Sequence, residues 1–185
     1  ATFGQEPRAA RRPARAMNDR SPSNIRAVAL LVLWAAIVGA FVAMVWRQRW
    51  IGDDGFINLR VAANVLDGYG PVFNVGERVE AYTSALWLLG VVAVTGLSGV
   101  RLEWAAVALG LGCSLLSMVV ASWGSLRLWS SRPYSLSTWA KLAPVPLGLV
   151  VYAALPPAWD YGTSALETPM SALWLAVVFA QMAAL

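Results

Sequence analysis

Residues 27–54 read AVALLVLWAAIVGAFVAMVWRQRWIGDD, and this stretch decides the fold class. Its first part, residues 27–46, carries no charge and has the ~20-residue length that a helix needs to cross a bilayer. No small-residue cleavage site follows it, so we expect an uncleaved membrane span. The stretch ends in Asp53 and Asp54, where the chain should leave the bilayer. Because neighbouring carboxylates disfavour joint ionisation, such a pair is typical of a metal or proton-handling site.

The composition is that of a membrane protein and excludes several kinds of chemistry. Of 185 residues, 58% are hydrophobic and 13% are charged, against roughly 25% charged in soluble domains. There is no His, which excludes Ser-His-Asp triads and His-ligated zinc. The lone Cys113 excludes a disulfide within the chain and a Cys-based zinc site. Any chemistry must therefore use carboxylates, Arg, Lys, Tyr, hydroxyls or backbone.

Residues 1–26 form a basic leader that carries six of the arginines. A nucleic-acid-binding arm is one interpretation. We favour a disordered cytoplasmic tail that orients the protein by the positive-inside rule, and we expect no nucleic-acid partner.

Five charge-free stretches are each close to spanning length: 27–46, 81–100, 104–126, 142–159 and 168–185. They predict an all-α polytopic membrane protein in the plasma membrane. The last stretch ends at Leu185 without a polar flank, so we expect the chain to be the front part of a longer protein.

Charge counting bears on whether 81–100 spans the membrane. If all five stretches span, Lys and Arg divide into seven inside and seven outside. If 81–100 lies at the interface or re-enters, the division is nine inside and five outside, which the positive-inside rule favours. The favoured topology has spans at 27–46, 103–126, 142–157 and 169–185, extracytoplasmic loops at 47–102 and 158–168, and a cytoplasmic loop at 127–141. It places Asp53, Asp54, Asp160 and Glu167 on one extracytoplasmic face.

Residues 55–67 are expected to form a helix that lies along the membrane, capped by Asp53 or Asp54 and ended by Gly68. At about 100° per residue, Arg60, Asn64 and Asp67 share one polar stripe, which we expect to face a cavity. Nearly all other positions are apolar, apart from Asn58 on the far side.

Each candidate site residue also has a purely structural interpretation. Capping accounts for one of Asp53 and Asp54 but not for both. Arg60 either pairs with Asp53 or Asp67, or binds a phosphate. Glu167 precedes Thr168-Pro169, a cap and a first-turn proline, so it either stabilises a helix N-terminus or serves the site.

Three motifs carry a resemblance to a known family: DDGFINLRVAANVL, then G-x-V-F-N-x-G-E-R-V-E-x-Y-T-S-x-L-W, then S-x-L-E-T-P-M. Their order after a first span closely resembles the GT-C superfamily of glycosyltransferases that use polyprenyl-phosphate sugars. Within it the chain is most similar to the actinobacterial family of terminal β-(1→2)-arabinofuranosyltransferases, over about residues 27–185. Ala81 and Ala165 depart from the usual pattern by small-for-small changes.

The resemblance implies a GT-C-type N-terminal transmembrane module with membrane-parallel helices in its first extracytoplasmic loop. It implies a catalytic carboxylate at Asp53, with Asp54 beside it, and Glu167 facing the same cavity. A divalent cation held by Asp54 and Glu167 is a further hypothesis, and Arg60 is the candidate for the donor phosphate. The remaining substrate-cavity candidates are Asn64, Glu77, Arg78, Glu80 and Tyr82.

The implied donor is decaprenyl-phosphate arabinofuranose, and the implied acceptor is the arabinan ends of arabinogalactan or lipoarabinomannan. No nucleotide or haem is expected. The alternatives are another polyprenyl-phosphate-sugar transferase, such as a mannosyltransferase, a transporter or flippase fragment that relays ions through its carboxylates, and a membrane scaffold.

Overall fold

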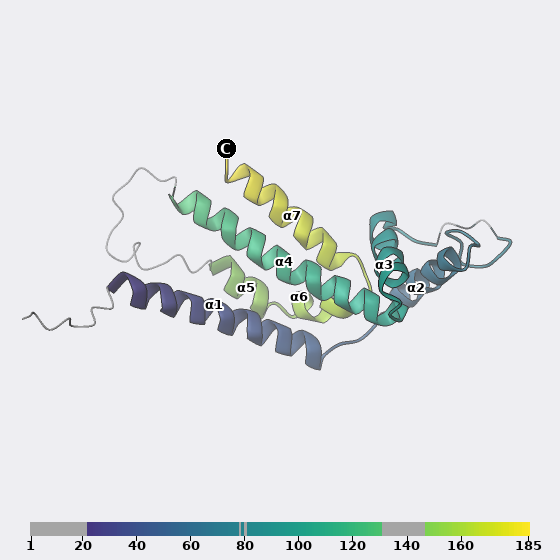
Figure 1. Cartoon of the computed structure of the whole chain (residues 1–185), viewed down its shortest axis with the longest axis horizontal. Helices are drawn as coiled ribbons and strands as arrows, with labels where there is room; N and C mark the ends of the chain where they lie inside the picture. Colours follow the sequence, from purple (N-terminus) through teal and green to yellow (C-terminus); the bar gives the residue numbers. More distant parts are fainter. Residues whose placement is uncertain (1–21, 78, 80, 131–146) are drawn as a thin grey trace, which may run out of the picture.

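The computed structural model describes residues 22–77, 79, 81–130 and 147–185, and within them it is helical, with no strand. The elements in chain order are α1 (Pro22–Arg47), α2 (Asp53–Leu66), α3 (Ala85–Ser98), α4 (Leu102–Ser130), α5 (Leu147–Ala154), α6 (Pro156–Asp160), the 3₁₀ turn η2 (Tyr161–Thr163) and α7 (Thr168–Met182). Figure 1 shows α1, α4 and α7 running along the long axis of the molecule, with α2 and α3 gathered at one end.

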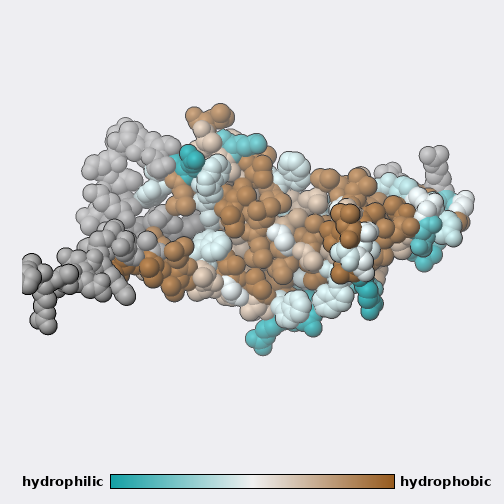
Figure 2. Space-filling view, in the orientation of Figure 1, coloured by the Kyte–Doolittle hydropathy of each residue, from teal (hydrophilic) through white to brown (hydrophobic). Residues whose placement is uncertain are grey.

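Two of the described helices are long and apolar enough to cross a membrane, Val28–Arg47 in α1 and Leu102–Trp129 in α4. Only 11% of the apolar stretch of α1 is buried, and its Leu31 is 68% exposed. Hydrophobic residues cover much of the middle of the face drawn in Figure 2, and hydrophilic residues gather near the helix ends and around the tip beyond α2. An apolar surface of this kind requires lipid or another apolar partner to cover it.

The long helices pack through small residues and a shared apolar core. Gly124 of α4 lies so close to α7 that an added Cβ would stand 2.9 Å from the Cα of Ala180. Small residues allow this approach, as they do in many membrane helix pairs. On the other side of α4, Phe41 and Val45 of α1 are buried together with Met118.

Aromatic side chains join α1 to α4 at the end of the bundle where α2 begins. The rings of Trp46 and Trp104 stack with their centroids 6.2 Å apart, and the Arg49 guanidinium lies 4.7 Å from the Trp46 ring centroid. We call Trp46, Trp104 and Arg49 the tryptophan clamp.

The predicted span 142–157 is only partly described, because 142–146 lie outside the described residues. Its described part is the eight-residue helix α5, which ends before Leu155. Pro156 then begins α6, because a proline without an N–H fits the first position of a new helix and not the interior of an old one.

The region 81–100 forms the 14-residue helix α3. Its length of about 21 Å is less than the ~30 Å hydrocarbon thickness of a bilayer. In Figure 1 it runs across the direction of α4. Its buried Trp87 and Val91 share a core with Val61 of α2 and Ala106 of α4, so α2 and α3 close one end of the bundle.

Residues 1–21 of the predicted tail and 131–141 of the predicted cytoplasmic loop lie outside the described residues. Residues 22–26 belong to α1, and residues 127–130 belong to α4.

Candidate active site

A cavity of about 320 Å³ lies between the first turn of α2, the segment before α3 and the segment before α7. Its lining consists of Asp54, Ile57, Asn58, Ala81, Tyr82, Thr83, Leu166, Glu167 and Thr168. We call it the acidic cavity. Three of the predicted site residues, Asp54, Tyr82 and Glu167, meet there from three separate parts of the sequence.

The two acidic residues at the start of α2 differ in position. Both are exposed in the first helical turn, but only Asp54 lines the acidic cavity. The prediction that one of them caps the helix is wrong, because Gly52 occupies the N-cap position and no side chain caps the helix. The backbone of Gly52 is held by its own bonds: its N–H donates to the Ser164 carbonyl at 3.1 Å, and its carbonyl accepts from the Phe56 N–H. Capping therefore explains neither carboxylate, although a helix N-terminus favours their negative charge.

Glu167 is the second carboxylate of the acidic cavity. It occupies the N-cap position of α7, yet its side chain makes no capping hydrogen bond. Instead, its Oε1 accepts a bond from the Thr83 hydroxyl at 3.5 Å. Thr168 is the first residue of α7 rather than its cap, and Pro169 lies in the first turn as predicted. Capping alone thus fails to explain Glu167.

The loop 160–167 brings Glu167 to Asp54 by docking on the start of α2. Gly55 makes room for it, because a Cβ at this position would lie 2.5 Å from the Ser164 carbonyl oxygen. The buried Trp87 indole donates to the Ala165 carbonyl at 2.8 Å, and Ala165 adopts a left-handed conformation with φ of 63°. Trp50 donates to the Asp160 carbonyl at 3.0 Å.

Arg60 and Asn64 share a face of α2, as predicted, but this face does not line the acidic cavity. The Nε of Arg60 donates to the Phe73 carbonyl at 2.9 Å, and its guanidinium lies 5.1 Å from the Phe73 ring centroid. The Nδ2 of Asn64 donates to the carbonyls of Val72 at 2.7 Å and Phe73 at 3.1 Å. The suggested ion pair of Arg60 with Asp53 or Asp67 is absent from the described residues. Gly68 ends the helix with φ of 85°, as predicted.

A second, open hollow of about 640 Å³ lies beside the loop that follows α2. Its described lining is Tyr69, Pro71, Val72, Gly76, Glu77, Val79 and Tyr82. We call it the loop hollow. Glu77 accepts a bond from the Asn74 amide at 3.0 Å. The candidates Arg78 and Glu80 lie outside the described residues.

Sequence reasoning missed Asn58. It lies on the far side of α2 from the stripe of Arg60 and Asn64, yet it is only 7% exposed and lines the acidic cavity. Its amide makes no hydrogen bond to any other described side chain or backbone group. The signal was its spacing, one helical turn after Asp54, which puts both residues on one face.

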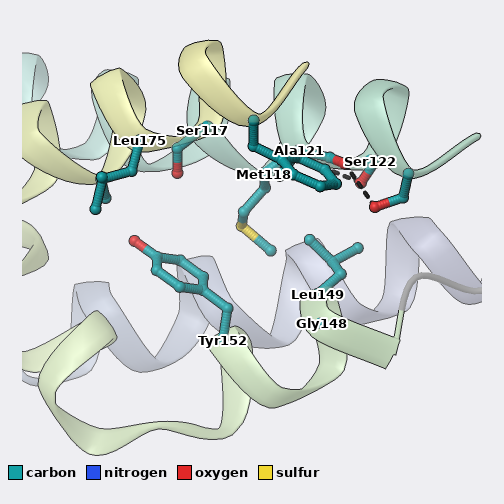
Figure 3. Close-up of a pocket in the computed structure, with 12 residues that line it drawn as sticks. Ser117, Met118, Ala121, Ser122, Gly148, Leu149, Tyr152 and Leu175 are labelled. Atoms are coloured by element: carbon teal, nitrogen blue, oxygen red, sulfur yellow. Dashed lines mark hydrogen bonds between the residues drawn. The ribbon is translucent and has the colours of Figure 1, made fainter. Parts of the chain in front are cut away.

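A third cavity, of about 390 Å³, lies in the middle of the bundle and is largely apolar. Figure 3 shows Tyr152 and Leu149 of α5 on one side of it and Met118 of α4 on the other. The other lining residues come from all three helices: Gly148 of α5, Ser117, Ala121, Ser122 and Ser125 of α4, and Ala172, Leu175, Ala176 and Phe179 of α7. We call it the bundle groove.

The described lining of the acidic cavity has two carboxylates, Asp54 and Glu167, which is fewer than a metal site made of protein ligands alone needs. Among the residues that the structure describes, no three acidic or thiol side chains gather closely enough to hold an ion. Mg²⁺, however, is commonly bound through one or two carboxylates together with substrate phosphate oxygens. Asp54 and Glu167 supply two carboxylates to the acidic cavity.

Two curated proteins are similar to this chain over most of its length. One, from Mycobacterium tuberculosis, is 41% identical over 162 residues, or 86% of this chain. The other, from Corynebacterium glutamicum, is 37% identical over 166 residues, or 89% of this chain. Both are named terminal β-(1→2)-arabinofuranosyltransferase. The chain is a homologue of part of these glycosyltransferases.

The resemblance expected from the three sequence motifs is therefore confirmed at the level of sequence. The chain spans 23% of the length of each curated relative. No protein-family model matches the chain, and no solved structure matches it.

In this arabinofuranosyltransferase homologue, Gly55→Ala is expected to lower the melting temperature in detergent. The new methyl group would push the 160–167 loop away from α2, and overpacking of this kind costs about 1–3 kcal/mol. Gly112→Ala in α4 is the matched control, because a Cβ there meets nothing within 4 Å. Equal melting temperatures for the two variants would contradict the close packing of the loop.

Proposed function

We propose that this chain forms the donor-binding and catalytic part of a membrane arabinofuranosyltransferase. The enzyme would move arabinofuranose from decaprenyl phosphate to the arabinan ends of arabinogalactan or lipoarabinomannan, on the extracytoplasmic face of the plasma membrane. The observation that carries the proposal is the meeting of Asp54 and Glu167 in one cavity at the end of the bundle. The names of the two homologues support the sugar and the linkage.

The contact between the loop after α1 and the loop before α7 supports an extracytoplasmic site. The loop after α1 and the loop before α7 dock on one another, so both lie on the same side of a membrane that α1 crosses. The basic leader favours a cytoplasmic N-terminus, which puts that side outside. In this topology α2 and α3 lie along the membrane as part of a GT-C-type module.

The carboxylates also stand where an interfacial reaction needs them. Asp54 lies in the first turn of α2, and Glu167 directly precedes α7. A transporter that relays ions would place acidic residues inside its spans. Residues at helix ends instead meet the headgroup of a lipid, so a glycosyltransferase is favoured over a transporter or flippase.

The transfer step follows from the groups in the cavity. The bond between C1 of the sugar and the phosphate oxygen breaks, and the phosphate keeps the electron pair. The acceptor hydroxyl oxygen bonds to C1, and its proton passes to Asp54, which also lies near the positive charge that develops on the sugar. Asn58 offers its amide to a sugar hydroxyl or phosphate oxygen.

Asp54→Asn is expected to lower kcat about 10²–10⁴-fold, the usual contribution of a general base. The sequence resemblance implied Asp53 as the catalytic carboxylate, but Asp54 is the one of the two that lines the cavity. Asp53→Asn is therefore the comparison variant, and it should retain more activity than Asp54→Asn. Radiolabelled arabinose transfer in membranes that carry the full-length protein measures both variants. An inactive Asp53→Asn beside an active Asp54→Asn would reverse the assignment.

We propose that the bundle groove holds the prenyl chain of the donor. Helix α7 links the two sites, because its first residue, Thr168, lines the acidic cavity and Ala172, about 6 Å further along, lines the bundle groove. A phosphate near Glu167 would thus leave its apolar tail beside α7, where burial of each CH₂ contributes about 0.8 kcal/mol.

Gly148→Phe is expected to raise the KM for a long-chain donor about tenfold, because Gly148 lines the groove and the ring would fill part of it. A donor analogue with a short prenyl chain should be affected much less. A Cβ at Gly148 meets nothing within 4 Å, so the new side chain starts in open space. Gly112→Phe, also without a close neighbour, is the control. Equal effects on long and short donors would exclude this groove as the tail site.

The third part of the proposal is a divalent cation held by Asp54 and Glu167. When bound, the ion would neutralise charge on the leaving phosphate. Treatment with EDTA should abolish transfer, and Mg²⁺ or Mn²⁺ should restore it in the native enzyme but not in Glu167→Gln. Full activity in EDTA would show that the two carboxylates act without a metal.

A further inference from the structure

The loop hollow is a separate space that neither the donor nor the transfer step uses. Residues within 69–77 form one side of it, with left-handed glycines at Gly70 and Gly76 that shape the chain into tight turns. With a volume of about 640 Å³, it is larger than the acidic cavity and has room for more than one sugar ring.

The loop is held in place by the predicted polar stripe of α2. Arg60 and Asn64 together make three hydrogen bonds to the carbonyls of Val72 and Phe73. Because both side chains come from a helix whose other face lines the acidic cavity, α2 fixes the hollow relative to Asp54. Such preorganisation lowers the entropic cost of binding.

Tyr82 connects the two spaces, since it lines both the loop hollow and the acidic cavity. A ligand in the hollow can therefore extend past Tyr82 toward Asp54. Among the described lining residues of the hollow, Glu77 is the charged one.

We propose that the loop hollow binds the glycan acceptor, a neutral furanose oligosaccharide whose terminal hydroxyl passes Tyr82 to reach Asp54. Tyr69, which is 58% exposed, and Tyr82 both line the hollow, and their aromatic rings are of the kind that stacks on the C–H surfaces of sugar rings. The Glu77 carboxylate, positioned by the Asn74 amide, accepts hydrogen bonds from sugar hydroxyls. The inference rests on the proposed function, since it names the second substrate of the same reaction.

Tyr69→Ala and Glu77→Gln test the acceptor site in the full-length protein, with a synthetic arabinofuranose oligosaccharide as acceptor. Each variant should raise the acceptor KM about 5- to 10-fold and leave the donor KM and the kcat at saturating acceptor unchanged. Tyr69→Phe should behave like the native protein, because it keeps the ring face. Val75→Ala is the matched control: Val75 is 60% exposed on the same loop but does not line the hollow.

Three results would overturn the inference: a native acceptor KM in both Tyr69→Ala and Glu77→Gln, an equal rise in donor KM, or the same effect in Val75→Ala. Direct titration of the acceptor into each detergent-solubilised variant without donor gives a second readout that does not depend on turnover. Failure of the proposed function is distinguishable, because the native protein would then transfer no arabinose and Asp54→Asn would change nothing, whatever the titrations show.

Discussion

The docking of the loop 160–167 on the start of α2 is the contact on which the rest of the structure depends. A backbone hydrogen bond from Gly52 to Ser164 holds the loop to the start of α2, and the indole bond from Trp87 to Ala165 holds it to α3. These contacts bring Glu167 to the acidic cavity that Asp54 lines from the first turn of α2. Both accepting carbonyls lie in a buried part of the loop, where an unsatisfied carbonyl costs about 1–3 kcal/mol.

Helix α2 uses its two sides for different purposes. One side presents Asp54 and Asn58 to the acidic cavity, and another side holds the loop hollow through Arg60 and Asn64. Its apolar residues are buried against α3 and α4. The helix is therefore a rigid spacer between the two spaces, and the proposed reaction needs both its length and its orientation.

The sequence alone was informative where the physics is local. Charge-free runs located α1, α4 and α7, and the order of three motifs located the family resemblance. The N-cap at Gly52 was missed because its partner, Ser164, comes from a contact that no local pattern reports. Arg60 shows the same limit of local patterns. The sequence offered an ion pair or a phosphate as its partner, whereas in the structure its Nε donates to the Phe73 carbonyl, a contact that depends on the path of the chain after α2. Asn58 was missed because the polar stripe was read as a single face, whereas α2 has two.

The tryptophan clamp has a consequence for how the molecule sits in its lipid surroundings. Indole rings prefer the depth of the phospholipid headgroups, so Trp46 and Trp104 would fix the vertical position of α1 and α4. Trp50, a few residues after Trp46, donates a hydrogen bond to the 160–167 loop. The position of the tryptophans in the membrane would therefore also set the depth of the carboxylates. In a thicker or thinner bilayer the long helices would tilt about this anchor while the reactive end kept its level.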